Sequence, residues 1–134
     1  MRPVPIGTKG EFSLLVRPEH LANRFKDAML PPVLSTPVMI MIMENAALNA
    51  LKPYLEPGES AVGTRIDIRH VAATPVGARV TGQAEVTAIL GRRIDFAVRA
   101  DDEHEEIGVG THERALVSLA RIAERLKAKG GGGS

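Results

Sequence analysis

The chain has 134 residues, enough for one domain with a real core, and its formal net charge is +1 at pH 7. This near-neutral charge argues against a nucleic-acid binder, and three Phe, one Tyr and no Trp provide no stacking platform for single strands. Because the chain has no cysteine, it has no disulfide, thiolate metal site or cysteine nucleophile. The start of the sequence also lacks an apolar secretory segment, so we expect a cytoplasmic protein.

The first predicted strand covers residues 11–17, where Phe12, Leu14 and Val16 fall on one side. Residues 18–30 are mixed and polar, and they predict one or two helical turns that end at the following pair of prolines.

A helix is predicted over residues 37–52, with Thr36 as its N-cap and Pro37 in its first position. Its first seven residues are apolar on all sides, which predicts a helix surrounded by protein. The apolar run is far shorter than the about 20 residues that span a bilayer, so we expect no membrane segment. Glu44 interrupts this run, and a buried carboxylate must be paired, protonated or used in chemistry.

Four further segments alternate between apolar and polar residues, which predicts strands; they cover residues 64–70, 80–90, 94–100 and 107–117. In the first of them, His70 shares the apolar face with Ile66 and Ile68. In the last, the odd-numbered residues from Ile107 to Val117 are expected on one face, which leaves Arg114 on the polar face. The acidic run between the last two strands predicts a solvated hairpin tip.

Residues 119–129 predict a short closing helix, and residues 130–134 a flexible glycine-serine tail outside a single domain of residues 1–129. One long apolar helix and five strands with antiparallel spacing predict an α+β protein in which the sheet wraps around the helix. This is the hot-dog fold. Its open edge strands favour pairing with a second copy, so we expect a homodimer.

Glu44 and His70 are the two titratable residues that the pattern directs toward the core. Each alone is more often a satisfied structural group, but a carboxylate and an imidazole on facing elements can form an acid–base site. Thr36 lies eight residues before Glu44, so the two side chains differ in direction by about 80° around the helix. A shared pocket is compatible with this spacing but does not follow from it.

Metal binding is not expected. The acidic run around His104 is better explained as a charged hairpin tip, and the sequence Thr111-His112-Glu113-Arg114 lacks the second histidine of a zinc motif. On its polar face, Arg114 is expected in solvent, with an anion or active-site contact as the alternative.

Several stretches between Val33 and Leu119 resemble the fluoroacetyl-CoA thioesterase family of hot-dog enzymes; they are residues 53–59, 63–64, 70–75, 91–93 and 106–115. The resemblance implies hydrolysis of an acyl-CoA thioester without a metal or bound cofactor. It places the catalytic threonine, glutamate and histidine at Thr36, Glu44 and His70. It places a substrate-binding glycine and arginine at Gly63 and Arg114.

The resemblance is weaker for substrate selection. The phenylalanine that closes over the substrate in that family has no clear equivalent, and Leu30 is the nearest candidate. We therefore expect a small acyl-CoA as substrate and a site near the subunit interface. Two alternatives remain at this stage, a non-enzymatic acyl-CoA binding module and an acyl-CoA hydratase or dehydratase of the same fold.

Overall fold

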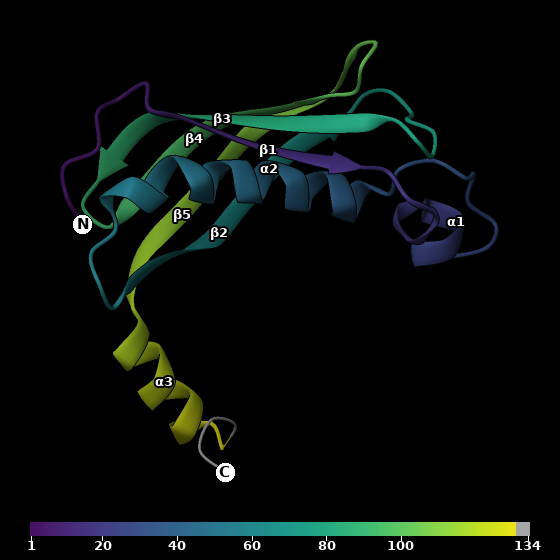
Figure 1. Cartoon of the computed structure of the whole chain (residues 1–134). Coiled ribbons are helices and arrows are strands. Elements are labelled where there is room, and N and C mark those ends of the chain that lie inside the picture. The colour runs from purple at the N-terminus through teal and green to yellow at the C-terminus, as the bar shows by residue number, and fades with distance from the viewer. Residues whose placement is uncertain (131–134) are drawn as a thin grey trace.

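The computed structural model describes residues 1–130, which form a curved antiparallel sheet with one long helix along its inner face (Figure 1). The strands are β1 (Lys9–Leu15), β2 (Glu59–His70), β3 (Arg79–Leu90), β4 (Arg93–Asp101) and β5 (Glu106–Ser118). The helices are α1 (Ala22–Phe25), α2 (Thr36–Leu51) and α3 (Leu119–Ala128), with short 3-10 turns at Pro18–His20 and Lys52–Tyr54. The strand order is β1-β3-β4-β5-β2, so β1 and β2 are the edges of the sheet. This architecture confirms the predicted α+β hot-dog fold.

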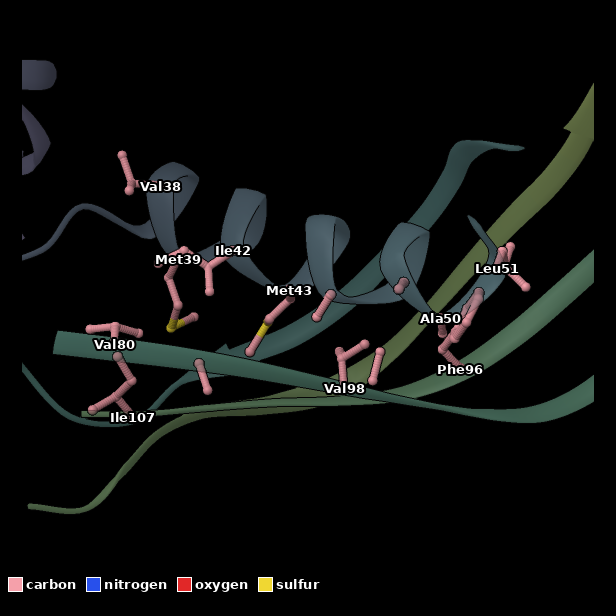
Figure 2. Packing of buried hydrophobic residues seen from close by; sticks show 14 of the residues in the cluster. Val38, Met39, Ile42, Met43, Ala50, Leu51, Val80, Phe96, Val98 and Ile107 are labelled. Carbon is pink, nitrogen blue, oxygen red and sulfur yellow. The ribbon is translucent and has the colours of Figure 1, made fainter. Parts of the chain in front are cut away.

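The core lies between α2 and the strands beneath it, where apolar side chains of both layers interdigitate (Figure 2). Met39, Ile42 and Met43 are fully buried on the sheet-facing side of α2, against Val98 and Ile107 among others. The helix approaches the sheet most closely where the strands carry glycine. A Cβ atom at Gly82 would lie only 2.9 Å from the backbone oxygen of Ile42. The glycines thus set the depth at which α2 packs.

The prediction that protein surrounds α2 on every side is wrong for the single chain. Ile40, Met41, Glu44 and Leu48 are only half-buried, because one sheet covers one side of a helix. The outward side of α2 therefore presents three large apolar side chains and a carboxylate at a surface that residues 1–130 of one copy leave partly uncovered.

Three strands contain bulges, and two of these bulges shift the face of a strand relative to the sequence prediction. A bulge between Gly63 and Arg65 separates the two halves of β2. The predicted inward face of β3 is correct up to Val86, but a bulge follows and leaves Leu90 exposed. An extra residue inserted into one strand of a pair moves every later side chain to the opposite face.

The predicted face of β5 is wrong for the same reason. The pairing with β4 is irregular near Asp101, so Ile107 and Gly108 are both buried and the even-numbered residues face inward from there. Val109 is 41% exposed, whereas His112 and Arg114 are 1% and 7% exposed. Arg114 therefore lies on the buried face and not on the solvated one.

The helix predicted after the last strand is present. The closing helix is α3, which projects away from the sheet and buries none of its residues (Figure 1).

The acidic hairpin between β4 and β5 differs from the prediction at one residue. Asp102 is buried instead of solvated, and its carboxylate accepts hydrogen bonds from Thr74 and from the backbone of His104 and Glu105. The predicted tail lies, except for Gly130, outside the described residues. Within residues 1–130, no helix is long and apolar enough to cross a bilayer.

Candidate active site

Thr36 and His70 meet where the start of α2 approaches the end of β2. Oγ1 of Thr36 lies 2.8 Å from Nδ1 of His70, and the two atoms form a hydrogen bond. Thr36 is the first residue of α2, and Ser35 occupies the N-cap position without a side-chain capping bond. The prediction of Thr36 as N-cap is therefore wrong by one residue, and its hydroxyl bonds to an imidazole instead of to a backbone N–H.

The imidazole of His70 is half-buried and shares its face with Ile66 and Ile68, as predicted. Burial lowers the pKa of His70 below its ordinary value of 6.5, which favours the neutral ring at neutral pH. Within residues 1–130, its Nε2 atom is buried without a hydrogen-bond partner. A neutral imidazole with one nitrogen held by a hydroxyl can pass a proton through the other.

Glu44 faces the central part of β2 at Gly63. A Cβ atom at Gly63 would lie 2.9 Å from Oε2 of Glu44 and 3.3 Å from Cε1 of His112. Glycine is therefore the residue that leaves room for the carboxylate next to the strand. Because the bulge follows directly, Gly63 and the later residues Ile66 and His70 can all face the helix side of the sheet.

Arg114 is the buried cation beside this carboxylate. Its Nε and Nη2 donate to the backbone oxygen of Ala61 at 3.2 and 2.7 Å, and its Nη1 donates to the backbone oxygen of Glu44 at 3.4 Å. Burial lowers the pKa of the Arg114 guanidinium, and the negative charge of Glu44 opposes this effect. An arginine nevertheless stays charged in proteins, so the site contains a fixed positive charge next to Glu44.

His112 is the residue that the sequence interpretation missed, because it was judged only as half of a zinc motif. Its ring is buried, stacks on Phe96 with 6.0 Å between centroids, and lies 3.0 Å from Nη1 of Arg114. The useful signal in the sequence was Gly108, because a glycine within a strand often marks a close approach of another element. A Cβ atom at Gly108 would meet Met39 and Met43 of α2, and His112 lies on the same face of β5.

The chain forms the site in two halves. Thr36 and Glu44 are separated by eight residues of one helix, or about 12 Å along its axis. Within residues 1–130, no hydrogen bond or ion pair joins Glu44 to Thr36 or to His70. Leu30 lies in the exposed loop between α1 and α2, and its role as a substrate contact stays a prediction. Also within these residues, no three His, Asp or Glu side chains gather as metal ligands would.

Residues 16–120 match the family described as fluoroacetyl-CoA-specific thioesterases. The chain belongs to this family.

Solved structures of thioesterases match nearly the whole chain and support its membership of the family. The fluoroacetyl-CoA thioesterase of Streptantibioticus cattleyicolor is 45% identical over 102 residues, which are 76% of this chain and 73% of that enzyme. A threonine-to-serine variant of a fluoroacetyl-CoA thioesterase, solved with acetyl-CoA, is 37% identical with a TM-score of 0.90, over 94% of this chain and 98% of that one. A Thermus thermophilus member of the thioesterase superfamily is 34% identical with a TM-score of 0.88, over 96% and 97% of the two chains.

In this family member, replacement of Gly63 by alanine should reduce activity without loss of stability. Gly63 does not have a positive φ, so its backbone accepts alanine. The new methyl group would displace the flexible end of Glu44, and the ring of His112, 3.3 Å away, would have to move by only a few tenths of an ångström. We expect kcat for thioester cleavage to fall by about 10- to 100-fold, while the melting temperature changes by only a few degrees.

Gly82→Ala is the matched comparison, because its methyl group would meet the backbone of Ile42, which cannot move aside. That variant should lose melting temperature. Equal kcat in Gly63→Ala and the parent would show that the space at Gly63 does not matter for Glu44.

Acid should destabilise the fold through its buried histidines. Burial is the main cause that lowers the pKa of His112 below 6.5, and the charge of Arg114 adds to it; burial also lowers the pKa of His70. Below about pH 6.5, the unfolded chain therefore binds protons that the folded chain does not, and the free energy of unfolding falls as pH decreases. Urea unfolding followed at several pH values measures this decrease.

The decrease should be smaller in His112→Gln, which has one titrating group fewer. An equal acid dependence in that variant and the parent would contradict the contribution of His112.

Proposed function

We propose that the protein hydrolyses a small acyl-CoA thioester to the carboxylate and free coenzyme A. The observation that carries this proposal is the position of the Glu44 carboxylate, which lies next to Gly63 and near the buried cation Arg114, in a member of a thioesterase family. The hydrogen-bonded pair of Thr36 and His70 supplies the second half of the chemistry. A carboxylate oxygen, a positioned proton carrier and N–H donors are the parts that acyl transfer requires.

In the proposed reaction, Glu44 either attacks the thioester carbonyl or removes a proton from the water that attacks it. The carbon–sulfur bond then breaks, and the departing thiolate receives a proton from the imidazole of His70. When Glu44 acts as the base, the proton that it took from water returns to His70. When Glu44 attacks, water hydrolyses the acyl–Glu44 anhydride that forms, which releases the carboxylate product and supplies that proton. We assign the hydroxyl of Thr36 as the donor to Nδ1 of His70, which leaves the ring hydrogen on Nε2. The N–H of Gly63 polarises the carbonyl, and Arg114 stabilises negative charge near Glu44. No metal or bound cofactor takes part.

Support for a small acyl group comes from the relatives. One is named a fluoroacetyl-CoA thioesterase, and another was solved with acetyl-CoA. We propose that Leu30 contributes to acyl selection from the loop before α2, where the family resemblance places a larger aromatic residue. A cytoplasmic location is part of the proposal and is supported by the absence of cysteine.

We further propose that two copies form a homodimer with the site near their interface. β2 is an edge strand with exposed residues in its centre, and an unpaired edge is suited to pairing with a second copy. The uncovered side of α2 exposes part of Ile40 and Met41 next to Glu44. In a twofold arrangement, Glu44 of one copy can meet the Thr36–His70 pair of the other, which would join the two separated halves.

The test is a panel of acyl-CoAs of increasing acyl length, with free thiol measured directly. The expected result is thiol release that is fastest for small acyl groups. A panel that includes a 2-enoyl-CoA separates the alternatives, because a hydratase would remove the conjugated absorbance without releasing thiol. Stabilisation by coenzyme A with no turnover of any member would instead indicate a binding module and would overturn the proposal.

A further inference from the structure

We propose that His112 is a positioning residue, which acts as a neutral acceptor to hold Arg114 against Glu44. The inference rests on the proposed hydrolysis and adds a residue to it. The imidazole of His112 forms two hydrogen bonds, with Arg65 and with Arg114, and the guanidinium of Arg114 in turn contacts Glu44.

The two ring nitrogens of His112 have partners that fix where the proton lies. Nδ1 is 2.7 Å from the backbone oxygen of Arg65, and a carbonyl oxygen can only accept, so Nδ1 carries the hydrogen. Nε2 is 3.0 Å from Nη1 of Arg114, and a guanidinium can only donate, so Nε2 carries none. Both bonds are satisfied together only by the neutral ring with its hydrogen on Nδ1.

The same guanidinium nitrogen links His112 to Glu44. Nη1 of Arg114 is shared between Nε2 of His112 and the backbone oxygen of Glu44, while the other two nitrogens are held by Ala61. The plane of the guanidinium is thus fixed from three sides. His112 also contributes directly to the walls around the carboxylate, because its Cε1 is 3.3 Å from the position of a Cβ at Gly63.

The choice of a neutral acceptor has an electrostatic consequence. A carboxylate at position 112 would pair with Arg114 and neutralise it, and a protonated imidazole would repel it. Neutral His112 satisfies one N–H of the buried guanidinium and leaves its positive charge available to Glu44. Its orientation is in turn fixed by the stack on Phe96 and by the bond to Arg65.

The test compares three replacements at this position. The amide of His112→Gln can place an acceptor near Nε2, His112→Asn can place a donor near Nδ1 only, and His112→Phe keeps the stack but neither bond. We expect kcat to fall by about 10- to 100-fold in the Phe and Asn variants. The Gln variant should recover most of kcat, and KM should change less than kcat throughout. His104→Gln, at an exposed histidine, is the matched control with parent activity.

Nitrogen NMR on the parent provides a readout that does not depend on activity. It should show His112 neutral with the proton on Nδ1, and slow hydrogen exchange at Nη1 of Arg114 that becomes fast in His112→Phe. A proton on Nε2, or equal kcat in the Gln and Phe variants of an active parent, would overturn the inference. If the parent releases no thiol from any acyl-CoA, the proposed hydrolysis is wrong, and so is a role of His112 in it. The NMR result tests the protonation state of His112 and its bond to Arg114 independently of activity.

Discussion

Replacement of Glu44 by glutamine is expected to lower kcat for acyl-CoA hydrolysis by about 10²- to 10⁴-fold. Glutamine has almost the same size and keeps an oxygen beside Gly63, but it is neither a base nor a nucleophile at neutral pH. The loss therefore reports the chemistry of the carboxylate and not its volume. Rates of thiol release at saturating and limiting acyl-CoA measure kcat and KM separately.

The control for this change is Glu124→Gln on the exposed helix α3, which removes the same charge far from the candidate site and should keep parent activity. Thermal unfolding of both variants excludes loss of the fold as the cause. If Glu44→Gln matched the parent on every thioester that the parent cleaves, the assignment of Glu44 would be wrong.

A mixture of two inactive variants is expected to regain activity. If each site takes Glu44 from one copy and His70 from the other, a dimer of Glu44→Ala with His70→Ala has one site with both residues intact. Random pairing makes half of the dimers mixed, and each has one working site, so an equal mixture should recover about a quarter of the parent activity. The variants are unfolded and refolded together, and thiol release is then compared with that of each variant alone.

Two controls make this recovery interpretable. Glu44→Ala refolded alone and mixed with Glu44→Gln should both stay inactive, because every site then lacks the carboxylate. Size measurement of the refolded protein establishes the dimer independently. A mixture that forms dimers but recovers no activity would show that each chain completes its own site, which would contradict a site shared between copies.

Sequence alone determined the elements and their order. The apolar run after Thr36 indicated α2, and the strict alternation around Phe96 indicated the inward face of β4, since both depend on periodicities within one element. The same periodicity brought Glu44 and His70 to attention as titratable residues on otherwise apolar surfaces. Their proposed roles, and that of Gly63, came from the family resemblance and stay predictions.

Only the tertiary structure decided which side chains face each other. The irregular pairing near Asp101 placed His112 and Arg114 inside, although the alternation from Ile107 predicted the opposite face. A bulge depends on how two strands align, and one extra residue inverts every later side chain although the apolar and polar residues still alternate along the sequence. The sequence thus determined that a carboxylate lies on α2, and the packing of β2 and β5 against that helix decided which cation and which imidazole lie beside it.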